Sequence, residues 1–188
     1  MRYVLVTGGL VLGLTLATRG GATVQPTTQP ADSSGHLSVE QMLEMADAAL
    51  ALEGGQRGID RYWLVALALH ESSGYSRAVG DEGEAVGLHQ FHRRAWTDCW
   101  GDADTFPRTD PVASFRAAIR YGKIAIRQYK GQKKLTALRR RETLSIHHHL
   151  GHWDPSDQRY SSGVERKYQQ LVREYGPTPK KEQPCTKP

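Results

Sequence analysis

The first regularity along the chain is a helical spacing of hydrophobic residues. In the stretch 38–53 they recur three or four positions apart, as Leu43, Ala46 and Leu50. This spacing places them on one face of an amphipathic helix. Ser38 and Gln41 stand in the arrangement of a capping box, and two glycines follow at 54–55. The pattern therefore predicts a helix that begins after Ser38 and ends at the glycines.

A second segment is hydrophobic on every side. Residues 62–69 read YWLVALAL, an uninterrupted apolar run that is typical of a buried helix. Asp60 is a suitable N-cap in front of it. We therefore expect a helix over residues 61–72 at the centre of the core.

Three further helices are expected in the second half of the chain. Asp110 and Pro111 combine an N-cap with a proline at the first helical position. The helix that follows them should run towards Gly131, and its apolar positions are Val112, Phe115, Ile119, Gly122 and Ile126. A shorter helix is expected over 142–150. The last one should begin near Ser161 or Ser162 and bury Val164, Tyr168, Leu171 and Val172.

Alternating strand patterns are nearly absent, and the loop 80–87 is the one place that suits a small hairpin. No internal repeat is visible. The expected fold is a mostly α single domain of five or six helices. About 140 residues, 37–176, suffice for one such domain with one core.

The two ends of the chain differ from this domain in composition. Residues 1–22 have an arginine, an apolar run and then small residues, as a secretory signal peptide does. The alternative is a retained N-terminal anchor, but the run is short for a membrane span. Residues 23–36 form a Pro/Thr/Ser-rich linker, and 177–188 a flexible tail. We expect an exported protein, periplasmic or extracellular, with no stable membrane span after signal cleavage.

The charge of the chain limits the kinds of partner it can bind, and its cysteines raise the question of a disulfide. The net charge is +5, with basic residues clustered at Lys133, Lys134, Arg139, Arg140 and Arg141. Such a cluster suits a solvated helix face or an anionic polymer. No nucleic-acid motif accompanies it, so no nucleic-acid partner is expected. The two cysteines, Cys99 and Cys185, either form one disulfide in an oxidising compartment or remain free thiols.

Glu71 is the strongest candidate for chemistry. It stands where the buried helix over 61–72 ends and a glycine-rich loop begins. Partial burial at such a boundary disfavours the charged form of a carboxyl group, which suits a general acid. Gly87 and Gln90 follow in a loop whose glycines allow the backbone to approach a ligand closely.

The segment from Glu71 to Gln90 resembles the signature of soluble lytic transglycosylases and their goose-type-lysozyme-like relatives. The matching residues are Glu71-Ser72, Ala78-Val79, Gly83, Ala85, Gly87-Leu88 and Gln90. The resemblance implies a lysozyme-like fold over about 37–175. It also implies cleavage of the β-1,4 bond between N-acetylmuramic acid and N-acetylglucosamine in peptidoglycan.

Carried onto this chain, the resemblance makes Glu71 the only acid and base. It would protonate the glycosidic oxygen and then take the proton of the muramic acid C6 hydroxyl, closing a 1,6-anhydro ring. No cofactor is needed. The other residues expected to touch or shape the sugar site are Ser72, Gly87, His89, Gln90, His148, His149 and Tyr160. The expected partners are glycan strands and cell-envelope machinery, and the protein should be a monomer.

The chain departs from the family pattern in three places. His89 stands where the family usually has methionine, and the loop 80–85 is more acidic than usual. The family's later Ala-Tyr-Asn-Ala-Gly motif is replaced by residues 147–151, HHHLG. If the glycines align, His148 takes the tyrosine position and His149 the asparagine position.

These departures leave three alternatives. Asp81, Glu82 or Glu84 could hold a water opposite Glu71, which would make the protein a hydrolase. The histidines at 89, 92, 147–149 and 152 could bind zinc, although His70-Glu71 lacks the second histidine of a His-Glu-x-x-His helix. The domain could also be an inactive glycan-binding or assembly module, because a fold does not by itself establish an activity.

Overall fold

A computed structural model of the chain describes residues 35–129 and 136–176. Six α-helices occur in these residues: α1 (Val39–Glu53), α2 (Arg61–Ser72), α3 (Arg93–Trp100), α4 (Pro111–Gln128), α5 (Ala137–Leu150) and α6 (Gln158–Tyr175). A two-stranded antiparallel hairpin, β1 (Val79–Gly80) and β2 (Ala85–Val86), encloses a short 3₁₀ turn, η1 (Asp81–Gly83). The mostly α fold with one small hairpin is confirmed.

Local sequence signals account for the first two helices. Ser38 and Gln41 form the predicted capping box at the start of α1, which ends at Gly54. The Asp60 carboxylate accepts a hydrogen bond from the backbone N–H of Trp63 and caps α2. Each cap satisfies backbone donors that a helix start would otherwise leave unpaired.

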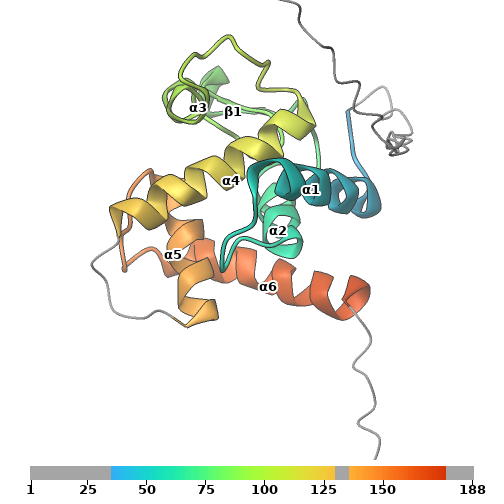
Figure 1. Cartoon of the computed structure of the whole chain (residues 1–188), viewed down its shortest axis with the longest axis vertical. Helices are drawn as coiled ribbons and strands as arrows, with labels where there is room; N and C mark the ends of the chain where they lie inside the picture. The colour runs from blue at the N-terminus through green and yellow to red at the C-terminus, as the bar shows by residue number, and fades with distance from the viewer. Residues whose placement is uncertain (1–34, 130–135, 177–188) are drawn as a thin grey trace, which may run out of the picture.

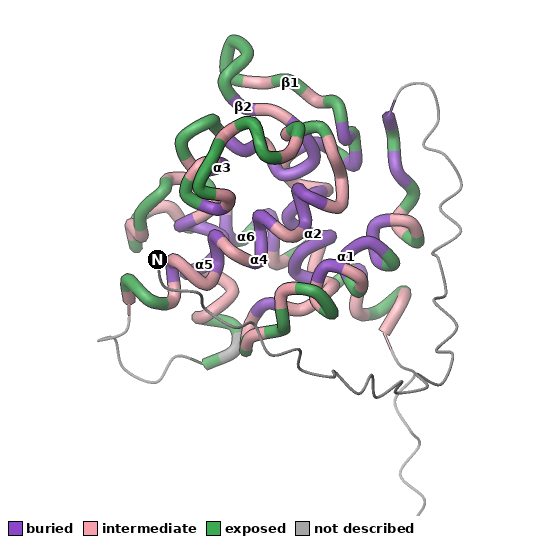
Figure 2. The backbone as a smooth tube through the Cα atoms, turned by 45° about the horizontal axis from the view of Figure 1, so that its top comes forward, coloured by how far each residue is buried: buried purple, intermediate pink, exposed green. Residues whose placement is uncertain are grey.

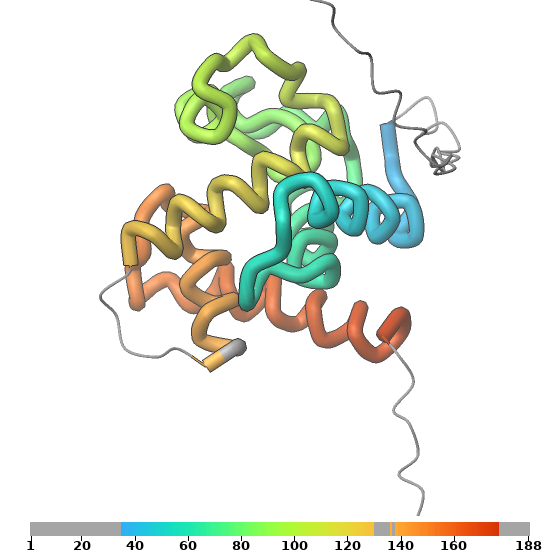
Figure 3. The backbone as a smooth tube through the Cα atoms, in the orientation of Figure 1, coloured from blue at the N-terminus to red at the C-terminus, as the bar shows by residue number. Residues whose placement is uncertain are grey.

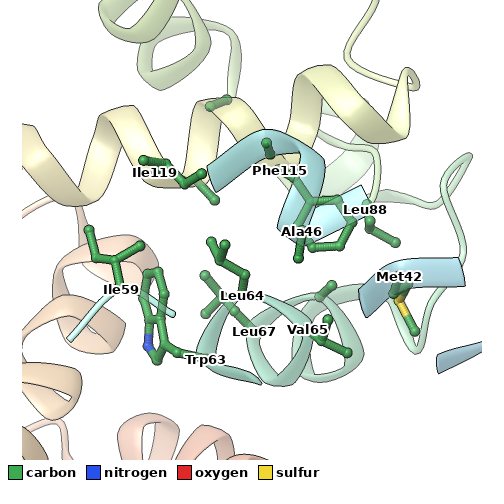
Figure 4. Packing of buried hydrophobic residues seen from close by; sticks show 14 of the residues in the cluster. Met42, Ala46, Ile59, Trp63, Leu64, Val65, Leu67, Leu88, Phe115 and Ile119 are labelled. Atoms are coloured by element: carbon green, nitrogen blue, oxygen red, sulfur yellow. The ribbon is translucent and has the colours of Figure 1, made fainter. Parts of the chain in front are cut away.

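Helix α2 lies at the centre of the core, as its sequence predicted. Six consecutive residues of it, Trp63–Ala68, are at most 1% exposed. Figure 4 shows Leu64 and Leu67 of α2 facing Phe115 and Ile119 of α4, with Ala46 of α1 beside them. Burial on all sides explains why this helix has no polar face.

The later helices differ from the sequence expectation at their ends. Helix α4 begins at Pro111 behind its Asp110 cap but ends at Gln128, and Gly131 lies outside the described residues. Helix α5 begins at Ala137, five residues earlier than expected, because the Thr136 hydroxyl caps it.

Helix α6 also begins early, at Gln158, and α3 was not expected at all. Both results trace to helix starts without a side-chain cap, since neither His92 nor Asp157 caps its helix with a side-chain hydrogen bond.

The helices arrange as two groups joined by α4. Figure 1 shows α3 and the hairpin at one end, α5 and α6 at the other, and α4 running between them. In Figure 3, the red and orange α6 lies beside the green α2, although about 90 residues separate them in sequence, and their packing is extensive. Figure 2 shows burial concentrated in the central helices and exposure at the hairpin tip.

Several sequence predictions fall on residues outside the described ranges. They include the signal peptide over 1–22, most of the linker over 23–36, Lys133, Lys134, the tail over 177–188 and Cys185. Cys99 is buried, and burial raises the pKa of its thiol to about 12. Within residues 35–129 and 136–176, no helix has the length and apolar character needed to cross a membrane.

Candidate active site

The cleft beside Glu71 is the larger of the two hollows described on the molecule, with a volume of about 780 Å³. The hairpin and α3 form one wall, α5 forms the other, and α4 lies between them. Glu71 enters the cleft from the last turn of α2, and its side chain is 15% exposed. The residues that line it are Glu71, Asp81, Ala85, Gln90, Phe91, His92, Arg94, Ala95, Asp98, Tyr121, Ile124, Gln128, His147, His148, His149, Leu150 and Gly151.

Tyr160 of α6 holds the Glu71 carboxylate. Its hydroxyl donates a hydrogen bond to Glu71 Oε1. Burial and the Glu71 charge raise the pKa of Tyr160 well above its usual value, so the phenol keeps its proton and remains a donor. The close packing of α6 against α2 thus brings together two residues that lie 89 positions apart.

Two histidines fix the ring of Tyr160. The His149 ring stacks on it at a centroid distance of 4.3 Å and an interplanar angle of 12°. The His70 ring meets it edge-on, with centroids 4.7 Å apart. His149 also lines the cleft and lies 3.7 Å from the Asp157 carboxylate. A phenol packed on both sides in this way has little freedom to turn away from Glu71.

His148 is a second polar neighbour of Glu71. Its Nε2 lies 2.9 Å from the backbone carbonyl oxygen of His89, so this nitrogen carries the proton. The same Nε2 is 3.9 Å from Glu71 Oε1. Burial lowers the pKa of His148, with the Glu71 charge opposing this shift. The ring is therefore neutral near pH 7, and its Nε2–H is donated to the His89 carbonyl oxygen rather than to Glu71.

His89 lies beneath the cleft rather than in its lining. Its side chain is fully buried, with Nδ1 2.9 Å from the Ser114 hydroxyl and Nε2 3.2 Å from the Leu64 carbonyl oxygen. Nε2 is thus the donor and Nδ1 the acceptor. Burial lowers the pKa of His89 to about 3, so it stays neutral. Its contact with the site is indirect, through the carbonyl group that accepts from His148.

Gln90 and Gly87 belong to the turn behind the hairpin. Gln90 lines the cleft, but its amide nitrogen donates to the carbonyl oxygens of Ala78 and Gly87, at 3.2 and 2.7 Å. Gly87 has φ +87°, and a Cβ there would lie 2.0 Å from the Arg108 carbonyl oxygen. Only glycine fits this position. Both residues stabilise the conformation of the turn at residues 87–90, beside the cleft.

Ser72 points into the protein, away from the Glu71 carboxylate. Its hydroxyl donates to the Ala68 carbonyl oxygen one turn earlier in α2, at 3.1 Å, and the residue is 8% exposed. Because the Ser72 hydroxyl donates within the helix, Ser72 stabilises the end of α2.

The acidic loop contributes one carboxylate to the cleft. Asp81 lines it, and its carboxylate lies 2.9 Å from Nε2 of His92, which also lines it. Glu82 and Glu84 are exposed and are not among the lining residues. Asp81 and Glu82 both have positive φ, at +46° and +54°, so the turn is held in a conformation that few non-glycine residues adopt.

The histidines do not gather into a metal-binding set. His89 is bonded inside the core, whereas His92 pairs with Asp81 at the surface. Within the described ranges, no group of three or more His, Cys, Asp or Glu side chains is arranged to hold a metal ion.

The sequence did not predict the part of the cleft that α3 and α4 line. The residues not expected there are Arg94, Asp98, Tyr121, Ile124 and Gln128, which come from α3 and α4. Tyr121 and Ile124 lie next to the apolar stripe of α4 and look like ordinary core positions in the sequence. Arg94 and Asp98 stand four residues apart, a spacing that is typical of the solvent-facing side of a helix, and this was the local signal that could have predicted α3.

Comparison with known proteins gives one result. The family model described as "Transglycosylase SLT domain" matches residues 50–144, which is half of the chain. No curated protein matches the chain. The matched span includes Glu71, the hairpin and α4, but it ends before His147–His149 and Tyr160.

Proposed function

This chain belongs to the transglycosylase SLT domain family, and on that premise we propose that it is a lytic transglycosylase of peptidoglycan. It would cleave the β-1,4 bond between N-acetylmuramic acid and N-acetylglucosamine and leave 1,6-anhydro-muramic acid ends. Family membership supports action on peptidoglycan. The observation that carries the specific reaction is the position of Glu71, a cleft carboxylate that accepts a hydrogen bond from Tyr160 and lies beside the neutral ring of His148.

Glu71 would act twice in the reaction. In its protonated form it gives its proton to the glycosidic oxygen, and the bond from that oxygen to C1 of muramic acid breaks. The resulting carboxylate takes the proton of the C6 hydroxyl, whose oxygen bonds to C1 and closes the anhydro ring. Glu71 ends the cycle protonated, and no water is consumed. One carboxyl group suffices because the nucleophile belongs to the substrate.

The neighbours of Glu71 suit a group that changes charge in this way. The Tyr160 hydroxyl donates to Glu71 Oε1, and the neutral ring of His148 lies 3.9 Å from the same oxygen without adding a positive charge. We propose Tyr160 and His148 as positioning residues and His149 as a support of Tyr160. Gln90 would line the sugar path, with Gly87, Ser72 and His89 maintaining the surrounding backbone.

Export of the protein follows from a peptidoglycan substrate, which lies outside the cytoplasm. We propose that residues 1–22 direct this export, to the periplasm or the cell exterior, and that the protein works as a monomer, alone or with cell-envelope machinery. No cofactor takes part in the proposed reaction.

A hydrolase is the second candidate, and the observation that favours it is Asp81 in the same cleft. A carboxylate opposite Glu71 could direct a water to C1 and give a reducing end. Two features weigh against it: the Asp81 carboxylate is 70% exposed, and it is already paired with His92.

The products distinguish the two reactions. Purified peptidoglycan is digested with the protein from residue 23 onward, and the released fragments are analysed by mass spectrometry. Fragments lighter by one water, with anhydro ends, support the transglycosylase. Reducing ends support the hydrolase, and their loss in Asp81→Asn would identify the second carboxylate. Binding without release would point to the inactive glycan-binding module.

Glu71→Gln tests the role of the carboxyl group. The amide keeps the size of the side chain but cannot donate and accept the transferred proton, so release should fall by at least about 100-fold. Glu44→Gln, the same change at an exposed position on α1, should leave release unchanged. Equal activity of Glu71→Gln and wild type, at matching thermal stability, contradicts the proposed mechanism.

A further inference from the structure

The β1–β2 hairpin forms part of the cleft wall, but its own strands hold it only weakly. Each strand has two residues, and an isolated two-stranded hairpin is at best marginally stable in water. Figure 2 shows it at the edge of the molecule, with an exposed tip. Asp81, Glu82 and Gln90 have positive φ. Such a conformation costs free energy in a residue with a side chain and persists only where the surroundings enforce it. Contacts from outside the hairpin must therefore fix its conformation.

Arg108, in the loop between α3 and α4, makes such a contact. Its Nη1 donates two hydrogen bonds, one to the Glu84 carbonyl oxygen at 2.6 Å and one to the Phe91 carbonyl oxygen at 2.9 Å. Because Glu84 directly precedes β2 and Phe91 follows the next turn, one NH2 group joins both ends of the segment 84–91. Arg108 is not among the residues that line the cleft, so it acts on the wall and not on a ligand.

The backbone of Arg108 approaches the same segment. A Cβ at Gly87 would lie 2.0 Å from the Arg108 carbonyl oxygen, so the two backbones are in direct contact. Two residues further on, the Asp110 carboxylate caps α4 by accepting from the Ala113 N–H. Arg108 thus connects the hairpin, by its side chain and its backbone, to the start of the helix that lies between the walls of the cleft.

Arg108 has no acidic partner within residues 35–129 and 136–176. Arg116 and Arg120 of α4, by contrast, both pair with the Glu53 carboxylate. Hydrogen bonds from a charged donor are stronger than those between neutral groups. An arginine that donates only to carbonyl oxygens of one segment is placed to fix that segment rather than to balance a charge.

The segment that Arg108 holds provides part of the cleft surface. Ala85, Gln90 and Phe91 all line the cleft. The Phe91 ring also meets the His148 ring edge-on, with centroids 5.0 Å apart, and His148 lies beside Glu71. A change in the position of this segment would therefore change the surface that a ligand meets.

We infer that Arg108 is a positioning residue, which fixes the segment 84–91 so that this wall is in place before a glycan strand binds. Without the Arg108 contact the segment can adopt other conformations, and binding must then order it at a loss of affinity. Once a strand is bound, cleavage at Glu71 proceeds as before, so the effect appears in KM and not in kcat. The inference rests on the proposed function, because it takes a glycan strand as the ligand.

Arg108→Met tests this role, since methionine keeps an unbranched side chain and removes the donors. Initial rates are measured on soluble, uncrosslinked peptidoglycan strands. KM should rise about 10-fold, as expected for loss of hydrogen bonds from a charged group, and kcat should stay within about twofold. Amide hydrogen exchange should become faster at Val86 and Gly87, whose N–H groups donate within the wall, and stay unchanged in α2.

Arg93→Met is the matched control. Arg93 is exposed, pairs with Asp104 at 3.5 Å and is not among the cleft-lining residues. Its substitution removes the same charge from the same side of the molecule and should change neither KM nor kcat. If Arg108→Met does not fold, Arg108→Lys takes its place. An ammonium group keeps the charge without the fixed geometry of the guanidinium, so KM should then rise about threefold, and a wild-type KM would overturn the inference.

Two kinetic results contradict the role of Arg108. A wild-type KM with a lower melting temperature would mean that Arg108 stabilises only the fold, and a lower kcat with unchanged KM would place its effect on bond cleavage. The proposed function is judged separately, by measuring the Kd of the same strands for the Glu71→Gln chain with and without Arg108→Met. Cleavage by the wild type with a Kd that does not depend on Arg108 overturns this inference alone. An Arg108-dependent Kd without cleavage by the wild type overturns the enzyme alone.

Discussion

At the scale of single residues, the site is a carboxylate that accepts a hydrogen bond from Tyr160 and lies beside the neutral ring of His148. Burial acts in opposite directions on the two neighbours of Glu71: it raises the pKa of Tyr160 and lowers that of His148. In both cases the uncharged form is favoured. A histidine at position 148 therefore adds no positive charge beside Glu71 near pH 7.

Tyr160→Phe tests the donor from α6. The change removes the hydroxyl that donates to Glu71 and keeps the ring that stacks on His149. Hydrogen bonds to charged groups contribute about 1.5–3 kcal/mol, so kcat for glycan release should fall by about 10- to 100-fold with little change in KM.

Tyr168→Phe is the matched control for this variant, because Tyr168 lies on the same helix and its hydroxyl donates to Asp60, away from the cleft. It should reduce stability slightly and leave kcat unchanged. A Tyr160→Phe enzyme with wild-type kcat would show that Glu71 needs no positioning from α6.

At the scale of elements, the site depends on how closely α6 approaches α2. Gly163 of α6 faces the His70 ring of α2, and a Cβ at Gly163 would lie 2.5 Å from Cε1 of that ring. His70 in turn meets Tyr160 edge-on. The absence of a side chain at one position thus sets the helix spacing, the His70 ring and the tyrosine that holds Glu71.

Gly163→Ala should separate these helices. Overpacking of this kind costs about 1–3 kcal/mol, only partly offset by the better helix propensity of alanine, about 1 kcal/mol. We expect a lower urea midpoint and reduced glycan release. Ser162→Ala, at the exposed neighbouring position, should change neither.

A second substitution distinguishes crowding from other causes. His70→Ala makes room for the new methyl group, so the double variant should be more stable than the sum of the two single effects predicts. Additive losses in this double-mutant cycle would mean that the His70 ring moves aside without cost and does not set the helix spacing.

At the scale of the whole molecule, buried neutral histidines make folding sensitive to acid. The pKa of His89 falls from 6.5 to about 3, and that of His147 to about 4. Between about pH 6.5 and those values the unfolded chain binds more protons than the folded one. The free energy of unfolding therefore decreases as the pH falls through this range.

His89→Met tests this linkage at one position. Urea unfolding is measured between pH 6.5 and 5.5, about one pH unit or more above 4.5, the usual pKa of a glutamate. Each fully buried neutral histidine contributes a slope of up to about 1.4 kcal/mol per pH unit. The variant should lose about that much of the wild-type slope, whereas the surface variant His152→Gln should keep it. An unchanged slope in His89→Met would show that His89 accepts a proton in the folded state.

The sequence by itself predicted every described helix except α3, the place of the hairpin, and Glu71 as the candidate acid. Capping boxes, N-caps and apolar spacing are local signals, so Ser38, Asp60 and Asp110 marked helix starts at single-residue precision. Where the cap was weak or absent, as at α3 and α6, the start was missed or displaced. Glu71 was found because the end of an apolar run and a loop motif coincide at one position.

Only the tertiary structure decided what surrounds that acid. Tyr160 and His148 lie 89 and 77 residues from Glu71, and no local pattern specifies contacts between such distant segments. Burial is a property of the packed helices, so the neutral state of His89, His147 and His148 could not be read from a run of histidines. The position of the carboxylate is thus predicted by local sequence, whereas its neighbours are brought to it by the packing of α5 and α6 with α2.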